Sequence, residues 1–106
     1  MDPKVERVIA AGAASGLTVE PRKFTSETRT AEDAARAVGC RVGQIVKSLV
    51  FCVDGEVVIA LMSGSNLLDE AKLAAAAGGQ RAWRQDADTV REATGFPVGG
   101  VPPFGH

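Results

Sequence analysis

The chain is organised around residues 44–62, which read QIVKSLVFCVDGEVVIALM. Two short runs rich in valine and isoleucine flank Asp54-Gly55, a dipeptide that favours the tight turn of a β-hairpin. We therefore predict two antiparallel strands with Asp54-Gly55 at the tip. Side chains alternate between the faces of a strand, and both faces of the first run are largely apolar. Such a hairpin is expected near the middle of a sheet or in a small barrel.

Length and composition are those of one globular domain spanning residues 1–106. Apolar residues make up 45% of the chain and charged residues 24%, which is ordinary for a protein with a packed core. No run approaches the roughly 20 apolar residues of a membrane span, and the first residues lack the apolar segment of a signal peptide. We expect a cytoplasmic protein that does not bind membranes.

The formal net charge of -1 weighs against a protein that grips a long stretch of phosphate backbone, so we predict no DNA partner. A protein that holds only one or two nucleotides remains compatible with this charge. The spacing of Cys40 and Cys52 fits neither a redox pair nor a zinc site, and we expect both to be reduced thiols in the core. No cofactor or metal is predicted.

Capping residues and glycines predict the remaining elements. Residues 95–106 contain many glycines and prolines, but interleaved apolar residues predict an ordered loop and not a solvated tail. The predicted elements are a helix over 3–14 ended near Gly16, a short strand over 17–20, a helix over 31–38 capped by Thr30 and closed by Gly39, a helical turn over 42–45, a helix capped by Asp69 that runs to Ala77, an edge strand over 81–84, and a helix from Asp86 to Thr94 closed by Gly95.

Two features could support chemistry. Lys47 lies among apolar neighbours, where an ammonium group can face a phosphate or a developing oxyanion, although a lysine at a strand start often only extends to solvent. Gly99 and Gly100 leave main-chain N–H groups accessible to a ligand, and the prolines that follow would stiffen the loop. Such a loop can equally be structural.

Two other polar residues are weaker candidates. Ser63 follows the second strand and either lines a pocket or belongs to a turn. His106 is the only histidine, and a terminal histidine is often inert. No arrangement of serine, histidine and aspartate typical of a hydrolase is found.

Four segments together resemble the YbaK/ProX family of aminoacyl-tRNA editing domains, which also occur inserted in bacterial prolyl-tRNA synthetases. The segments are TAEDAA at 30–35, QIVKSLVF at 44–51, DEAK at 69–72 and GFPVGGVPPFGH at 95–106. The last of them is similar to the family pattern G-x-x-P-x-x-H at Gly100, Pro103 and His106.

The resemblance implies an α+β fold with a mixed, curved, barrel-like sheet and helices packed around it. It implies a deacylase that works without a metal and hydrolyses the ester of mischarged tRNA, removing a small amino acid such as alanine or cysteine, most often from tRNA for proline. Lys47 would face the terminal adenosine, and Gly99, Gly100 and His106 would complete the catalytic loop. Substrate contacts are assigned to the following residues: Phe24, Arg29, Thr30, Ser63 and Pro103.

The chain departs from the family in two ways. Family domains continue past the position of His106 with closing strands, so we expect this chain to lack them. Members that clear cysteine often lack the motif histidine, so His106 favours alanine or another small residue. Two alternatives remain open: a non-catalytic module that binds the aminoacyl-adenosine end or docks on an aminoacyl-tRNA synthetase, and a domain that binds an unrelated metabolite.

Overall fold

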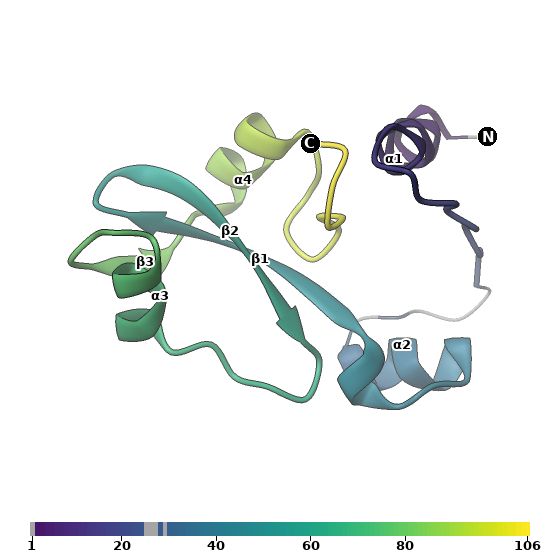
Figure 1. Ribbon diagram of the computed structural model, residues 1–106, viewed down its shortest axis with the longest axis horizontal. Coiled ribbons are helices and arrows are strands. Elements are labelled where there is room, and N and C mark those ends of the chain that lie inside the picture. Colours follow the sequence, from purple (N-terminus) through teal and green to yellow (C-terminus); the bar gives the residue numbers. More distant parts are fainter. Residues whose placement is uncertain (1, 25–27, 29) are drawn as a thin grey trace.

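A computed structural model describes residues 2–24, 28 and 30–106, and it confirms the α+β class (Figure 1). No helix among these residues is long and apolar enough to cross a membrane. The elements follow in the order α1 (Pro3–Ala14), α2 (Ala31–Val38), the 3-10 turn η1 (Val42–Gln44), β1 (Val46–Val53), β2 (Glu56–Ser63), α3 (Glu70–Ala76), β3 (Ala82–Arg84) and α4 (Ala87–Thr94).

The predicted hairpin forms as β1 and β2. The two strands pair antiparallel from Val46 opposite Ser63 to Val53 opposite Glu56. Asp54 and Gly55 have φ angles of 49° and 89°, the left-handed conformation that a type I′ turn requires at both central positions. The Asp54 carboxylate accepts backbone N–H groups from Gln80 and Arg81, which ties the hairpin tip to the start of β3.

β1 is the central strand of a three-stranded antiparallel sheet with the order β2-β1-β3. Pairing with β3 is confined to residues 51–53 of β1, with one further hydrogen bond from the Gln85 N–H to the Val50 carbonyl. Within the described residues the sheet stays open and does not close into a barrel. Among the described residues, the first half of β1 is therefore paired along the β2 side only.

The core lies mainly where β1 faces α3. Phe51 and Val53 are buried there against Ala74 of α3 and Ala82 of β3. Partly buried side chains surround this cluster: Leu49, Val58, Leu68 and Leu73. Val50 and Cys52 alternate onto the opposite face and are also buried, so both faces of the second half of β1 are covered, as predicted. Cys40 is half-buried, and both cysteines are free thiols.

The predicted helix caps are confirmed. The side chains of Thr30, Asp69 and Asp86 each accept a backbone N–H from the third residue on. Gly39 and Gly95 close α2 and α4 in the left-handed conformation. Each cap satisfies a backbone group that the helix itself leaves unpaired.

One predicted element is wrong. Residues 17–20 do not form a strand. The alternation of apolar and polar residues is present, but a strand needs a hydrogen-bonded neighbour, and none of the described strands pairs with this segment. Pro21 removes a further donor at its end. The segment instead connects α1 to the rest of the molecule, and Val19 packs against Gly12.

Truncation of the central core side chain tests this packing. Phe51 is only 2% exposed, so Phe51→Ala should lower the free energy of unfolding by about 3 to 5 kcal/mol. Leu67→Ala is the matched control, because Leu67 is 92% exposed and its truncation should change stability by no more than about 0.5 kcal/mol. Urea unfolding measures both, and equal losses in the two variants would contradict this core.

The cap of α4 predicts an acid dependence of stability. Hydrogen bonds from the Thr89 N–H and hydroxyl hold the pKa of Asp86 below its ordinary value of 3.8. A carboxylate whose pKa is lower in the folded state stabilises the fold above its unfolded-state pKa and loses this effect as the pH falls through the folded-state pKa. The stability difference between the wild type and Asp86→Asn should therefore be largest at neutral pH and shrink below pH 3.8. Parallel urea-unfolding results across this range would count against the cap.

Candidate functional site

A cleft of about 370 Å³ runs along the half-paired edge of β1. Its lining includes every residue from Ile45 to Phe51, whose side chains alternate between the two faces of the strand. The cleft therefore follows the strand edge and not one face of the sheet. The other described lining residues are Thr28, Thr30, Ala31, Ala34, Arg84, Gln85, Val90, Val98, Gly99 and Val101.

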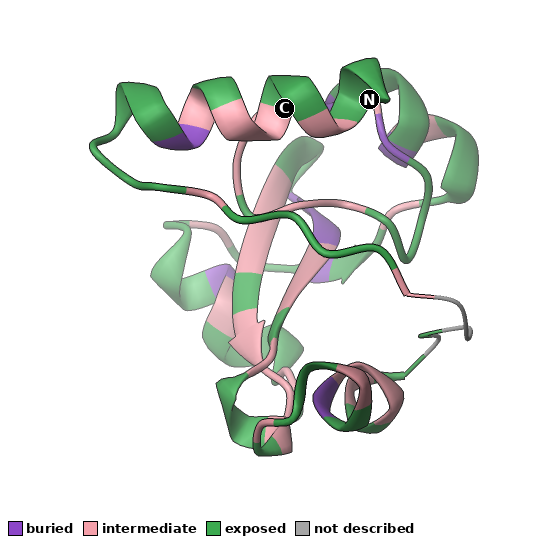
Figure 2. Cartoon of the chain, turned by 90° about the vertical axis from the view of Figure 1, so that its right-hand side faces the viewer, coloured by how far each residue is buried: buried purple, intermediate pink, exposed green. Residues whose placement is uncertain are grey.

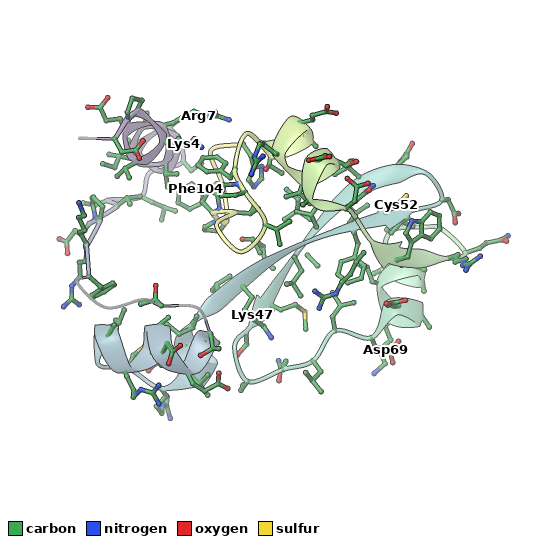
Figure 3. All side chains as sticks on the ribbon, turned by 180° about the vertical axis from the view of Figure 1, so that it is seen from behind. Lys4, Arg7, Lys47, Cys52, Asp69 and Phe104 are labelled. Atoms are coloured by element: carbon green, nitrogen blue, oxygen red, sulfur yellow. The ribbon has the colours of Figure 1, made fainter. Side chains whose placement is uncertain are left out.

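Lys47 is half-buried and lines this cleft. Its Nζ donates a hydrogen bond of 3.0 Å to the carbonyl of Asn66, in the segment between β2 and α3 (Figure 3). This bond ties the ammonium to the segment that follows β2. An ammonium group has three donors, so two remain for a ligand.

The glycines of the terminal loop, defined as residues 95–105, lie in two different hollows. Gly99 lines the cleft with Lys47, which places these two predicted residues around the same cavity. Gly100 lines a second groove, beside α1, together with Pro97 and Pro102. The Gly100 N–H donates to the Pro97 carbonyl at 2.9 Å and so closes a turn, whereas no acceptor for the Gly99 N–H is found in the described part of the chain.

The two predicted hydroxyl residues have structural partners. Thr30 lines the cleft, and its Oγ1 accepts the Asp33 N–H that caps α2. Ser63 lies outside the described lining. Its Oγ donates to the Gly43 carbonyl at 2.7 Å and lies 3.2 Å from the Ser65 hydroxyl, which joins the end of β2 to η1.

Other predicted site residues lie away from the cleft. Phe24 is half-buried, with the Arg22 guanidinium 5.6 Å from its ring centroid, and it does not contribute to the described lining. Pro103 and His106 are exposed and line neither hollow in the described structure. Arg29 lies outside the described residues.

Two lining residues carried no site assignment from sequence. Arg84, at the end of β3, has its guanidinium 5.9 Å from the ring centroid of Phe51. Ser48 alternates with Val50 on β1, and its buried Oγ has no hydrogen-bond partner among the described residues. The sequence signal for Arg84 is a cation at the end of an edge strand, which becomes informative only once that strand is placed beside β1.

The charges of the cleft are all of one sign. Lys47 and Arg84 are the charged side chains in the described lining, which contains no carboxylate. The remaining lining is apolar or uncharged. Two cations beside an apolar surface favour a ligand that carries an anionic group, such as a phosphate, next to a flat or apolar group. In residues 2–24, 28 and 30–106, no three histidine, cysteine or acidic side chains gather as a metal site would need.

A family model for the aminoacyl-tRNA editing domain matches residues 25–106, and the chain belongs to this family. A proline–tRNA ligase of Maridesulfovibrio salexigens is 37% identical over 81 residues, which are 76% of this chain and 14% of that protein. The uncharacterized protein YwhH of Bacillus subtilis is 32% identical over 83 residues, or 78% of this chain and 53% of that protein.

A solved structure described as a candidate trans-editing enzyme for prolyl tRNA synthetase superposes with a TM-score of 0.88 at 43% identity. The match covers 100% of this chain and 68% of that one. The chain thus spans only part of the length of its curated relatives, about one seventh in the case of the ligase.

Gly99 offers a test of the loop conformation. Its φ of 81° strains any residue with a β-carbon, yet nothing lies within 4 Å of the place where that carbon would be. The cost of Gly99→Val is therefore conformational, on the order of 1 to 2 kcal/mol of unfolding free energy. Gly99→Asn should cost less, because asparagine adopts this conformation more readily. Urea unfolding that finds the two variants equally stable would contradict the backbone geometry at Gly99.

Proposed function

We propose that this chain is an aminoacyl-tRNA deacylase that hydrolyses the ester of mischarged tRNA in trans. The substrate class is tRNA carrying a small amino acid, alanine or cysteine, with tRNA for proline as the expected carrier. The proposal is carried by one observation: in a chain of the editing-domain family, Lys47, Arg84 and Gly99 line the same cleft.

The cleft suits the end of a tRNA better than its helical body. A volume of about 370 Å³ is at the small end of the range for ligand sites and suffices for part of a terminal nucleotide with a small amino acid. Lys47 and Arg84 would face the phosphate of that nucleotide, and Leu49 and Val98 provide apolar surface for the base or the amino-acid side chain. Recognition confined to one end agrees with a net charge of only -1.

The chemistry requires no nucleophile from the protein. A water oxygen attacks the ester carbonyl carbon, and the carbonyl oxygen becomes an oxyanion that the Gly99 N–H can stabilise. The bond from that carbon to the ribose oxygen then breaks, the ribose oxygen takes up a proton, and the attacking water gives one up to solvent. The products are a free amino acid and a tRNA with a free terminal hydroxyl. We assign His106 no step, because its exposed side chain lies outside the cleft.

A second function is favoured by the state of Gly100. Its N–H is already bonded to the Pro97 carbonyl, so the pair of glycines offers one amide to the cleft and not two. One accessible amide would be sufficient for a site that binds an aminoacyl-adenosine end without cleaving the ester. Such a module would act by holding the tRNA end or by docking on an aminoacyl-tRNA synthetase.

Mischarged tRNA tests the first function directly. Alanyl- and cysteinyl-tRNA for proline are incubated with the wild type and with Lys47→Ala, and release of the amino acid is followed. Lys47→Ala removes a charge-assisted hydrogen bond to the phosphate of the substrate, and such a bond is worth about 1.5 to 3 kcal/mol. At low substrate concentration, release of the amino acid should therefore slow by about 10- to 100-fold. Lys72→Ala is the matched control, because Lys72 is an exposed lysine on α3 outside the described lining.

Three results would change this assignment. Equal hydrolysis by the wild type and Lys47→Ala would remove Lys47 from the mechanism. Tight binding of a non-hydrolysable aminoacyl-adenosine analogue with no turnover of the ester would favour the binding module. If the protein shows no binding of the analogue and no turnover of the ester, both functions are left unsupported.

A further inference from the structure

The terminal loop is supported by α1, a helix that lies outside the residues matched by the family model. A β-carbon added at Gly12 of α1 would lie 3.2 Å from the Phe104 ring, and one added at Gly105 would lie 3.2 Å from the Val8 Cα. The helix and the loop therefore approach closely at both positions. Figure 2 shows that α1 is otherwise largely exposed, and Gly12 is its one buried residue.

Arg7 of α1 contacts both ends of the loop. Its Nε donates to the Gly105 carbonyl at 2.8 Å, and its Nη2 donates to the Thr94 carbonyl at 3.3 Å. The guanidinium also lies 5.2 Å from the centroid of the Phe96 ring, within the range of a cation–π contact. Figure 3 shows Arg7 on α1 beside the terminal loop. One side chain thus joins the residue before the loop to the last residue of the loop.

The chemistry of the side chain suits this task. A guanidinium carries five N–H donors in a planar fork, so it can bond two carbonyls at once while its face stacks on a ring. A lysine has one nitrogen and cannot reproduce this geometry. At the Thr94 end a second anchor exists, because the buried Thr94 hydroxyl donates to the Val90 carbonyl at 2.7 Å and accepts the Phe96 N–H at 3.1 Å. At the Gly105 end, the bond from Arg7 is the one side-chain hydrogen bond found among the described residues.

The loop between these ends depends on such anchors. It contains no helix or strand, and its described internal backbone hydrogen bond runs from Gly100 to Pro97. Gly99 lies near the middle, in a left-handed conformation, and no described atom beyond its chain neighbours lies within 4 Å of the place where a β-carbon would be. A shift of the Gly105 end would therefore move Gly99 relative to the β1 edge.

We propose that Arg7 is a positioning residue, which holds the terminal loop so that the Gly99 N–H faces the cleft. The proposal rests on the deacylase function for its catalytic consequence and on the hydrogen bonds of Arg7 for its structural one. Misplacement of a reacting group by about 1 Å can cost on the order of 100-fold in rate. Arg7 itself touches neither the cleft nor, on this proposal, the substrate.

The test combines deacylation kinetics with amide hydrogen exchange. Arg7→Ala should lower kcat by about 10- to 100-fold with little change in KM, because substrate still binds the Lys47 end of the cleft. The Gly100 N–H should exchange faster with solvent, while amides of β1 keep their protection. Arg7→Lys should restore part of kcat, since it keeps the charge and one bond. Arg91→Ala is the control, because Arg91 is an exposed arginine on α4 outside both hollows.

Each outcome has a defined reading. Kinetics and exchange of Arg7→Ala equal to those of Arg91→Ala would overturn the proposal. Faster exchange throughout β1 would do the same, because it would mean a general loss of stability. If Arg7→Ala does not fold, the same comparisons are made with Arg7→Lys. If the wild type does not deacylate, the proposed function fails, and exchange alone decides whether Arg7 holds the loop.

Discussion

The structure depends on the way β1 is paired. Its second half is buried on both faces and bonded on both sides, to β2 and to β3, so it is fixed by packing and by backbone hydrogen bonds. Its first half is paired with β2 only, within the described residues. Backbone groups along a free strand edge are available to a ligand, and the cleft lies along this edge. One strand therefore serves as core at one end and as the wall of the site at the other.

The charge pattern of the cleft follows from the same strand. Lys47 sits at the open end of β1, while Arg84 comes from the strand that pairs with its closed end. The two cations thus belong to different strands, and both line the cleft. Because no carboxylate lies in the described lining to neutralise them, their field acts on whatever enters. A phosphate-bearing ligand gains from both, whereas a neutral one gains only from the apolar floor.

Local signals made much of the fold predictable from sequence. The Asp54-Gly55 turn, the side-chain caps and the closing glycines act over a few residues, so the sequence alone reveals them. The strand predicted over 17–20 failed because a strand is defined by its neighbour, and the neighbour is not encoded in the segment itself. For the same reason, the order of the strands in the sheet cannot be predicted from the separate segments.

The site was predictable only in part, for the same physical reason. Lys47 and Gly99 stood out through their local context, and the structure brings both to the cleft. Arg84 did not stand out, because its role depends on β3 pairing with β1 across many intervening residues. The different environments of Gly99 and Gly100 depend on the turn at Pro97, which adjacent glycines in a sequence cannot reveal.

The contact between α1 and the terminal loop bears on how such a loop can work at all. A glycine-rich segment leaves its N–H groups accessible because it lacks side chains, and the same lack deprives it of packing contacts and raises the entropy lost on ordering. Order must therefore come from the apolar residues between the glycines, such as the buried Phe96, and from contacts with the rest of the chain. Thr94, the residue before the loop, fixes one end by accepting the Phe96 N–H, and Arg7 bonds the other end from a helix far away in sequence. The glycines thus make the amides accessible, whereas other residues of the chain keep the loop ordered. The loop can therefore expose main-chain N–H groups to the cleft and still hold a fixed conformation.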